Sequence, residues 1–358
     1  MSISQPTDLE GLSSTERDLL RKSVRELLAK RWPADRAVEA ALDGAAVASI
    51  WRELAGQGLG ALGADTTGLR EAMLVFEELG RASCPAPMLG AVAANMTLGH
   101  EQSNTAAAFL GDVHRGEARI ALALGGFDGD PAAGSMAMRD GALSGRTPFV
   151  EGAQTATHFL VLTDGGVAMV TASAPGVAMQ ATPGLAVPAL SELSFTNTPA
   201  VHWTMSANRL ADIAVVARLA CAGRALGAAQ RAFEMAVEHA KVRKQFGQLI
   251  GQFQAVQHKL ADCLTSLDGA RLTLESAADA RDNGNPDWRF FAAAALAFAG
   301  PALREVSIQT HRALGAIGYA EEHEAPRHFR RVHADLARFG GAPRARAELA
   351  DLVLGPAT

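Results

Sequence analysis

The chain has 358 residues, a net charge of −5 at pH 7 and 48 % hydrophobic residues. This length exceeds one simple core and predicts two or three packed units. The mildly acidic balance gives no support to a nucleic-acid partner. The cysteines Cys84, Cys221 and Cys263 lack metal-ligand spacing and cannot build a disulfide framework, so we expect a reducing, cytoplasmic location.

The first hundred or so residues read as helices. Residues 13–16, Ser-Ser-Thr-Glu, form a capping box ahead of a helix that Trp32 and Pro33 stop. A second helix is expected around residues 47–54, ending at Gly56, and a third from Gly68 to a break near residue 80. No N-terminal signal pattern and no uninterrupted apolar run of bilayer length is seen, so we expect no membrane partner.

Between residues 117 and 202 the sequence pattern changes to short apolar runs that are separated by clusters of Gly, Asp, Pro and Ser. The runs read ARIALAL, THFLVLT, GVAMVTA and SELSFTNT. They predict strands in a small antiparallel barrel or sandwich. From residue 207 to 354 the helical period returns, with a loop at 281–286 and an all-round apolar stretch at 290–303 that predicts a buried helix or a subunit interface.

The most informative string is KVRKQFGQLIGQFQAVQHKLAD, residues 241–262. Gly247 is predicted to end a helix with positive φ, and Arg243 to lie in its last turn, where it could reach a phosphate. After the break, four residues at helical spacing predict a buried stripe, namely Phe253, Val256, Leu260 and Leu264.

This string resembles the R-x-x-F-G…F-Q segment of the acyl-CoA dehydrogenase family. IWRELAGQGLGALG and EAMLVFEELGRASCPAP also resemble its N-terminal helices. The resemblance covers essentially the whole chain. It implies a mostly α fold with an N-terminal helical domain (1–115), a central β domain (116–205) and a C-terminal four-helix bundle (206–358). It also implies FAD-linked α,β-dehydrogenation of an acyl-CoA, with electrons passed to an electron-transfer flavoprotein.

The resemblance assigns cofactor contacts to three segments. The segment at 241–262 would touch the ADP half of a flavin that is held mainly by a neighbouring subunit. The residues in contact would be Arg243, Gln245, Phe246, Phe253 and Gln254. HRALGAIGYA would meet the same pyrophosphate through Arg312, Gly315 and Ala316. GRTPFVEG replaces the family's Trp-Ile-Thr step with Phe149, Val150 and Glu151, and a carboxylate at Glu151 would oppose a reduced flavin.

The family's catalytic glutamate has no counterpart in this alignment. One family position is taken by Ala217 and the other by Phe339 or Gly340, and none of these side chains accepts a proton. Arg218 matches the arginine near the acyl thioester. No metal is expected, because the spacing of the nearby histidines does not set ligands on one helix face, namely His311, His323, His328 and His333.

Three interpretations follow. The favoured one is a subunit without the base, paired with a sister acyl-CoA dehydrogenase subunit. The second is an active homomer with a relocated base, for which the candidates are Glu151, Asp212 and Glu322. The third is a flavin- or acyl-CoA-binding protein with a different reaction or none.

Overall fold

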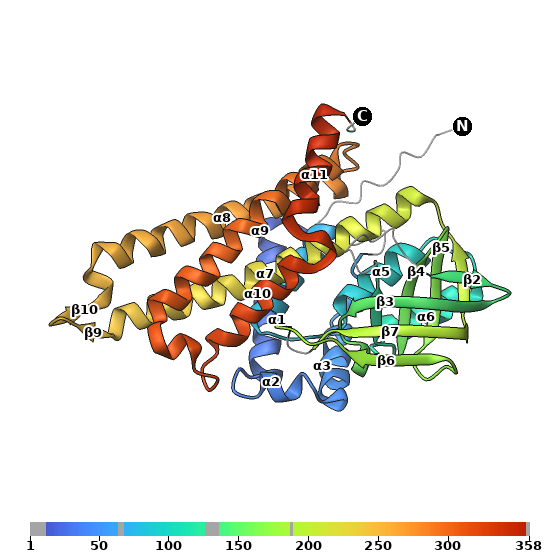
Figure 1. The fold of residues 1–358 in the computed structure, drawn as a ribbon, viewed down its shortest axis with the longest axis horizontal. Helices are drawn as coiled ribbons and strands as arrows, with labels where there is room; N and C mark the ends of the chain where they lie inside the picture. The colour runs from blue at the N-terminus through green and yellow to red at the C-terminus, as the bar shows by residue number, and fades with distance from the viewer. Residues whose placement is uncertain (1–11, 64–67, 126–135, 187–188, 356–358) are drawn as a thin grey trace.

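The computed structural model describes residues 12–63, 68–125, 136–186 and 189–355. An N-terminal group of helices, a pair of four-stranded sheets and a C-terminal group of long helices follow one another along the chain (Figure 1). The sheets lie at one end of the molecule, and the long helices extend away from them to the opposite end.

The three helices predicted in the N-terminal region, now α1 (Ser14–Arg31), α3 (Gly44–Gly56) and α4 (Leu69–Arg81), begin and end close to the predicted residues. The structure adds α2 (Ala37–Ala40), η1 (Leu59–Ala61), α5 (Met88–Leu98) and α6 (Asn104–His114). The predicted capping box is confirmed, because Ser13 and Glu16 exchange side-chain and backbone hydrogen bonds. Helix α4 is buried along almost its whole length, and its acidic side chains are paired with arginines of α1.

The central strands form two sheets. The first has the order β1-β4-β5-β8 and the second β2-β3-β7-β6. Their bounds are β1 (Ile120–Ala123), β2 (Ala137–Arg139), β3 (Ala142–Val150), β4 (His158–Thr163), β5 (Gly166–Thr171), β6 (Val177–Ala181), β7 (Ser191–Pro199) and β8 (Val201–Thr204), with η2 (Ala153–Thr155) after β3. The prediction of a purely antiparallel arrangement is wrong at one pair, since β1 and β4 run parallel. The chain reaches β4 only after the β2–β3 hairpin, and this long crossover permits the parallel pairing.

Three strands of the first sheet, β1, β4 and β5, are mostly apolar and buried because both faces of that sheet are covered. In β4, Phe159 and Val161 face the second sheet, while Leu160 and Leu162 belong to the helical core. The edge-to-face contact between Phe159 and Phe195, with centroids 6.2 Å apart, joins the two sheets. The two sheets therefore form a sandwich, and one of them also packs on helices.

The C-terminal region consists of α7 (Ala207–Val242), α8 (Gln254–Asp282), α9 (Trp288–Leu314), α10 (Ala325–Ala337) and α11 (Gly341–Leu354). Helices α7 to α10 pack against one another as a bundle, and α11 adds a fifth helix against α9. Short 3₁₀ segments connect them, namely η3 (Ile250–Gln252), η4 (Gly315–Tyr319) and η5 (Arg338–Gly340).

The break between α7 and α8 differs from the prediction. Gly247 is not a helix C′ residue. Helix α7 ends at Val242, and the chain then forms a two-stranded hairpin, β9 (Lys244–Gln245) with β10 (Gln248–Leu249). Phe246 and Gly247 make its two-residue turn with φ of 51° and 82°. Positive φ at both central positions is what a tight hairpin requires, so the glycine serves this turn rather than the helix.

The predicted stripe on α8 is right at three of its four positions. Phe253, Val256 and Leu260 are half-buried, and the same helical face continues through the buried residues Cys263, Leu267, Ala270 and Leu274. Leu264 lies one position off this face and is 44 % exposed.

Helix α9 contains the apolar stretch at 290–303. By length and composition the segment Trp288–Tyr319 could cross a membrane, but half of its most apolar window is buried inside the protein. Since α9 packs against α7, α8 and α11, we interpret it as the central helix of the bundle. One continuous core includes this bundle and the N-terminal helices, so the division at residues 115 and 205 remains a proposal about the chain's organisation.

Candidate functional site

A cavity of about 420 Å³ lies between the β sandwich and the bundle. We call it the interdomain pocket. Its described walls come from β3, the β6–β7 connection and the α10–η5 segment. They are formed by Leu124, Pro148, Phe149, Thr182, Pro183, Gly184, Leu185, Ala186, Leu190, His333, Ala334, Ala337, Arg338, Phe339 and Gly340. Among these described residues none is acidic, so the cavity is apolar with an arginine and a histidine on its helical side.

The residues of the predicted Phe-Val-Glu step lie in different surroundings. Phe149 is 41 % exposed on the pocket wall, with φ of 59°. Val150 is buried in the core of the sandwich. Glu151 turns away from the pocket wall and enters a buried cluster of charges. The positive φ at Phe149 coincides with an irregular register between β3 and β7, which re-aims the side chains at the end of the strand.

Three arginines surround Glu151. Arg224 of α7 donates two hydrogen bonds to its oxygens at 2.9 and 2.7 Å. Arg331 of α10 donates one at 2.9 Å and Arg338 one at 2.6 Å. Arg224 also donates to Asp335 at 2.7 Å. We call these five residues the Glu151 cluster. It joins the β domain to two helices of the bundle.

The Glu151 cluster corrects the electrostatic prediction. Burial by itself would raise the pKa of Glu151, but the guanidiniums, Arg224 foremost, hold that pKa well below its ordinary value. The carboxylate is therefore ionised and fully paired. Three guanidiniums face two carboxylates, Glu151 and Asp335, so the cluster carries an excess of positive charge. The prediction that the negative charge of Glu151 would oppose a reduced flavin is therefore wrong, because the surrounding arginines neutralise that charge.

The two sequence positions that match the family's catalytic base lie in different parts of the structure. Ala217 is buried in α7 at 1 % exposure. Phe339 and Gly340 line the interdomain pocket and, with Gly341, have positive φ in succession. This left-handed turn redirects the chain from α10 into α11. Neither position presents an acidic group.

The residues predicted to grip a pyrophosphate lie away from the interdomain pocket. The β9–β10 hairpin, with Arg243, Gln245 and Phe246, projects at the end of the bundle opposite the β sandwich (Figure 1). Phe246 is 93 % exposed. The end of α9 and η4, with the exposed residues Arg312, Gly315 and Ala316, reaches the same end, since Leu314 packs with Met235 and Ala236 of α7.

Gln254 is exposed and Phe253 is half-buried, in edge contact with Phe246 at 6.2 Å between centroids. The structure thus brings these predicted residues together at one end of the bundle. It does not bring them to Phe149 within one chain.

Comparison with known proteins decides the family. The model for the acyl-CoA dehydrogenase C-terminal domain matches residues 209–342. Acyl-CoA dehydrogenase IpdE2 of Mycobacterium tuberculosis is 31 % identical over 330 residues, which are 89 % of this chain and 91 % of that protein. The chain belongs to the acyl-CoA dehydrogenase family. IpdE2 of Mycolicibacterium smegmatis is 29 % identical over 92 % of this chain and 96 % of its own length.

Two solved structures of this acyl-CoA dehydrogenase fold are heteromeric complexes. The Tcur3481-Tcur3483 steroid enzyme, in a G363A variant, is 27 % identical with a TM-score of 0.85, over 95 % of this chain and 98 % of that one. The ChsE4-ChsE5 complex from Mycobacterium tuberculosis is 24 % identical with a TM-score of 0.84, over 98 % and 100 %. The predicted mostly α fold with a central β domain is confirmed.

As a member of this family of oxidoreductases, the chain is expected to share its cofactor, FAD. The residues present fit that group in two places. At the interdomain pocket, Phe149 offers a ring face and Arg338 a buried Nε atom without a partner. At the hairpin, Arg243 and its neighbours offer exposed polar groups for phosphates. When bound, FAD supplies the hydride acceptor of the family's reaction.

Arg218, the predicted thioester residue, lies in a second cavity of about 300 Å³. It is 5 % exposed, and its Nη2 atom pairs with Glu348 of α11 at 2.7 Å. Its Nε and Nη1 atoms are buried without partners. Two buried donors beside the apolar wall of Leu210 and Ala214 suit an acceptor oxygen on an apolar ligand.

Several site residues were missed by sequence reasoning. Arg224, Arg331, Arg338 and Asp335 carried no predicted role. A partial signal existed in the helical spacing of Arg331 and Asp335, which are four residues apart. Nothing in the sequence says that these charges are buried or that a strand ends against them, so the cluster could be found only from the tertiary structure.

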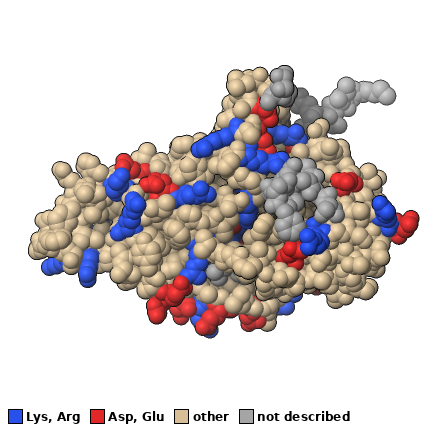
Figure 2. Space-filling model, in the orientation of Figure 1, with Lys and Arg blue, Asp and Glu red and all other residues tan. Residues whose placement is uncertain are grey.

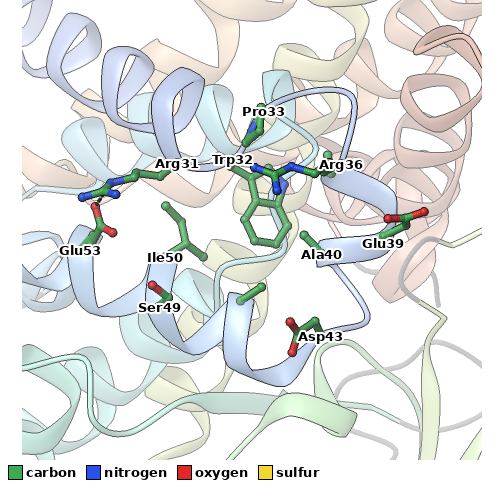
Figure 3. A pocket seen from close by; sticks show the side chains of 12 residues that line it. Arg31, Trp32, Pro33, Arg36, Glu39, Ala40, Asp43, Ser49, Ile50 and Glu53 are labelled. Carbon is green, nitrogen blue, oxygen red and sulfur yellow. Dashed lines mark ion pairs between the residues drawn. The ribbon is translucent and has the colours of Figure 1, made fainter.

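A further cavity of about 450 Å³ lies between the end of α1, α2 and α3. Figure 3 shows Trp32 and Ile50 among its labelled side chains and the ion pair between Arg31 and Glu53 at one side. It contains none of the predicted site residues. Among described residues, no group of His, Cys, Asp and Glu side chains is placed to hold a metal.

Proposed function

We propose that this chain is the subunit without a catalytic glutamate in a heteromeric acyl-CoA dehydrogenase. Its hairpin would grip the ADP half of a flavin whose ring lies in a sister subunit. The substrate is an acyl-CoA thioester, and an electron-transfer flavoprotein receives the electrons. The cytoplasm is the proposed location, since Cys84, Cys221 and Cys263 are all free and buried.

The main support is the lack of any carboxylate among the described walls of the interdomain pocket, although Phe339 and Gly340 lie there. The family's proton transfer needs a positioned base within reach of the substrate. Similarity to subunits of two heteromeric enzymes points the same way.

The relocated bases considered from the sequence fit less well. Glu151 is held ionised by three arginines, and its lowered pKa makes it a poor proton acceptor. Asp212 pairs with Arg289 at the start of α7. Glu322 is exposed in the loop before α10. None of the three lines the interdomain pocket.

Exposure of the hairpin supports a partner subunit. Phe246 and Val242 are 93 % and 73 % exposed, and Arg243 is exposed beside them. Large apolar side chains around a cation at a projecting tip are typical of a surface that another chain covers. On the face in Figure 2, basic and acidic side chains are interspersed over the rest of the molecule.

The first prediction tests this contact in the assembled complex. Arg243→Ala removes a cation facing the phosphates, and we expect FAD to dissociate about 10-fold more readily, a loss typical of one charge-assisted contact. Lys241→Ala, two residues earlier at the exposed end of α7, is the matched control and should retain FAD. The fluorescence of the FAD that is released when each complex is diluted measures its dissociation from both variants.

The purified chain alone should be colourless or hold FAD below one equivalent. A stoichiometric yellow protein with robust turnover in the absence of any sister subunit would support the homomeric alternative instead. Equal FAD retention in the Arg243 and Lys241 variants would place Arg243 on an ordinary surface. Acyl-CoA binding with no flavin in any assembly would favour the non-catalytic alternative.

A further inference from the structure

A small cavity of about 30 Å³ lies where the three parts of the fold meet, and the proposed function gives it no role. We call it the junction cavity. Its described walls come from the α4–α5 connection and the first turn of α5, from β1, from η2, and from α7 and η5. We propose that the junction cavity binds a small monovalent inorganic anion of the size of chloride.

Two arginines of the Glu151 cluster line the junction cavity, Arg224 and Arg338, and both are more than nine-tenths buried. The Nη atoms of Arg224 donate to Glu151 and Asp335, but its buried Nε atom has no hydrogen-bond partner among the described residues. A buried N–H group without an acceptor is costly, so an acceptor is expected beside it. Arg338 also lines the interdomain pocket, so we assign the contact to Arg224 Nε and an additional positive charge to Arg338.

Helix α5 begins at the wall of the same cavity, which Pro87, Leu89 and Gly90 help to form. The helix has 11 residues and no side-chain cap. Within the described part of the chain, the backbone N–H groups of Leu89 and Gly90 have no acceptor. A helix N-terminus carries a partial positive charge and free N–H donors, and this combination binds anions. Backbone donors and the Nε donor of Arg224 therefore belong to one small cavity.

The electrostatic surroundings of the junction cavity are positive. Arg119, just before β1, is a further cation on its wall. Burial lowers the pKa of Arg119, and the neighbouring Arg52 lowers it further, as expected where cations are crowded. With the Glu151 cluster, Arg119 makes four guanidiniums against two carboxylates. Glu151 also lines the cavity, but both of its oxygens already accept hydrogen bonds from arginines. An anion would offset this excess charge.

The volume of the junction cavity limits the ligand. One water molecule needs about 10–15 Å³ of such space, so 30 Å³ admits a single ion of chloride size and excludes a nucleotide phosphate or a fatty carboxylate. A water molecule would also fit, but it brings no negative charge to a positive site. A bound anion would connect α5 to α7, and hence the N-terminal helices to the bundle.

The second prediction is that chloride stabilises the full chain. A ligand that binds only the folded state raises the melting temperature with the logarithm of its concentration. Above the dissociation constant, each tenfold rise in chloride should add about 2 °C for a chain of this length. Sodium chloride is exchanged for sodium gluconate at constant sodium, because gluconate is too large for the cavity. Bromide should act as chloride does, and equal melting temperatures in chloride and gluconate would overturn the proposal.

Two variants separate the site from general effects of salt. Arg119→Gln removes a cation of the wall and should weaken the chloride dependence about 10-fold. Arg115→Gln is the matched control, since it removes the same charge just after α6, where the side chain is 59 % exposed. The control should keep the chloride dependence of the unchanged protein. The same dependence in both variants would overturn the proposal.

Crystals of the full chain grown in sodium bromide locate the ion directly. We expect anomalous density from bromide between Arg224 and the first turn of α5. Density for water alone in the junction cavity would overturn the anion. Neither FAD nor acyl-CoA takes part in these measurements, so their failure would leave the proposed function unchanged, and failure of the proposed function would leave the anion site unchanged.

Discussion

At the scale of single residues, Glu151 shows how surroundings change the meaning of a side chain. In the sequence it is an acid where the family has a hydroxyl residue. In the structure it accepts from three buried arginines. Removing one member of such a network leaves uncompensated buried charge, which costs more than the network contributed when complete.

The third prediction follows from this asymmetry. Glu151→Gln leaves three guanidiniums facing Asp335 alone and should lower the free energy of unfolding by about 3–5 kcal/mol. The control is Glu192→Gln on β7. Glu192 Oε1 lies 3.3 Å from Nη1 of Arg146, whose side chain is 63 % exposed. Because this ion pair is solvated, we expect its loss to lower the free energy of unfolding by less than about 1 kcal/mol. Urea unfolding compares the two. Similar small losses would mean that water compensates the arginines.

At the scale of elements, the crossing of α4 and α7 depends on glycine. A Cβ atom on Gly227 would lie 1.8 Å from the carbonyl oxygen of Glu77, and one on Gly80 1.9 Å from that of Arg224. The two backbones are therefore in direct contact. This contact sets the position of Arg224 and hence of the Glu151 cluster.

The fourth prediction is that Gly227→Ala destabilises the protein although alanine is the better helix former. The methyl group forces the two backbones apart, at an expected cost of about 1–3 kcal/mol or more. Gly56→Ala in α3, where nothing lies within 4 Å of the added atom, should be neutral or stabilising by about 1 kcal/mol or less. Thermal unfolding distinguishes them, and a stabilised Gly227 variant would show that the helices can separate freely.

At the scale of the whole molecule, apolar side chains remain uncovered on the bundle. Phe290 and Phe298 of α9 are 38 % and 44 % exposed, and the ring of Phe298 lies over Gly269 of α8. Exposed aromatic groups on a long helix are typical of a surface that another subunit covers.

The fifth prediction concerns assembly. Phe298→Ser removes apolar area from this surface and should shift the oligomer toward smaller species, as measured by size-exclusion chromatography with light scattering. Glu305→Ser, exposed on the same helix, is the control and should leave the mass unchanged. An unchanged mass for both variants would place the subunit contacts elsewhere.

The sequence by itself determined the order of elements, many of their limits and the family. Caps, glycine breaks and hydrophobic periods act over a few residues, so the capping box at Ser13 and the continuous apolar strands could be read locally. The resemblance in residues 241–262 belongs to the same kind of local information.

Only the tertiary structure decided where Gly247 turns the chain and what Glu151 and His333 contact. These outcomes depend on groups far apart in the chain. Glu151 meets Arg338 across 187 positions, and Ser307 meets His333 across 26. Charge and hydrogen bonding act through space, and their effect depends on burial, which no local pattern specifies.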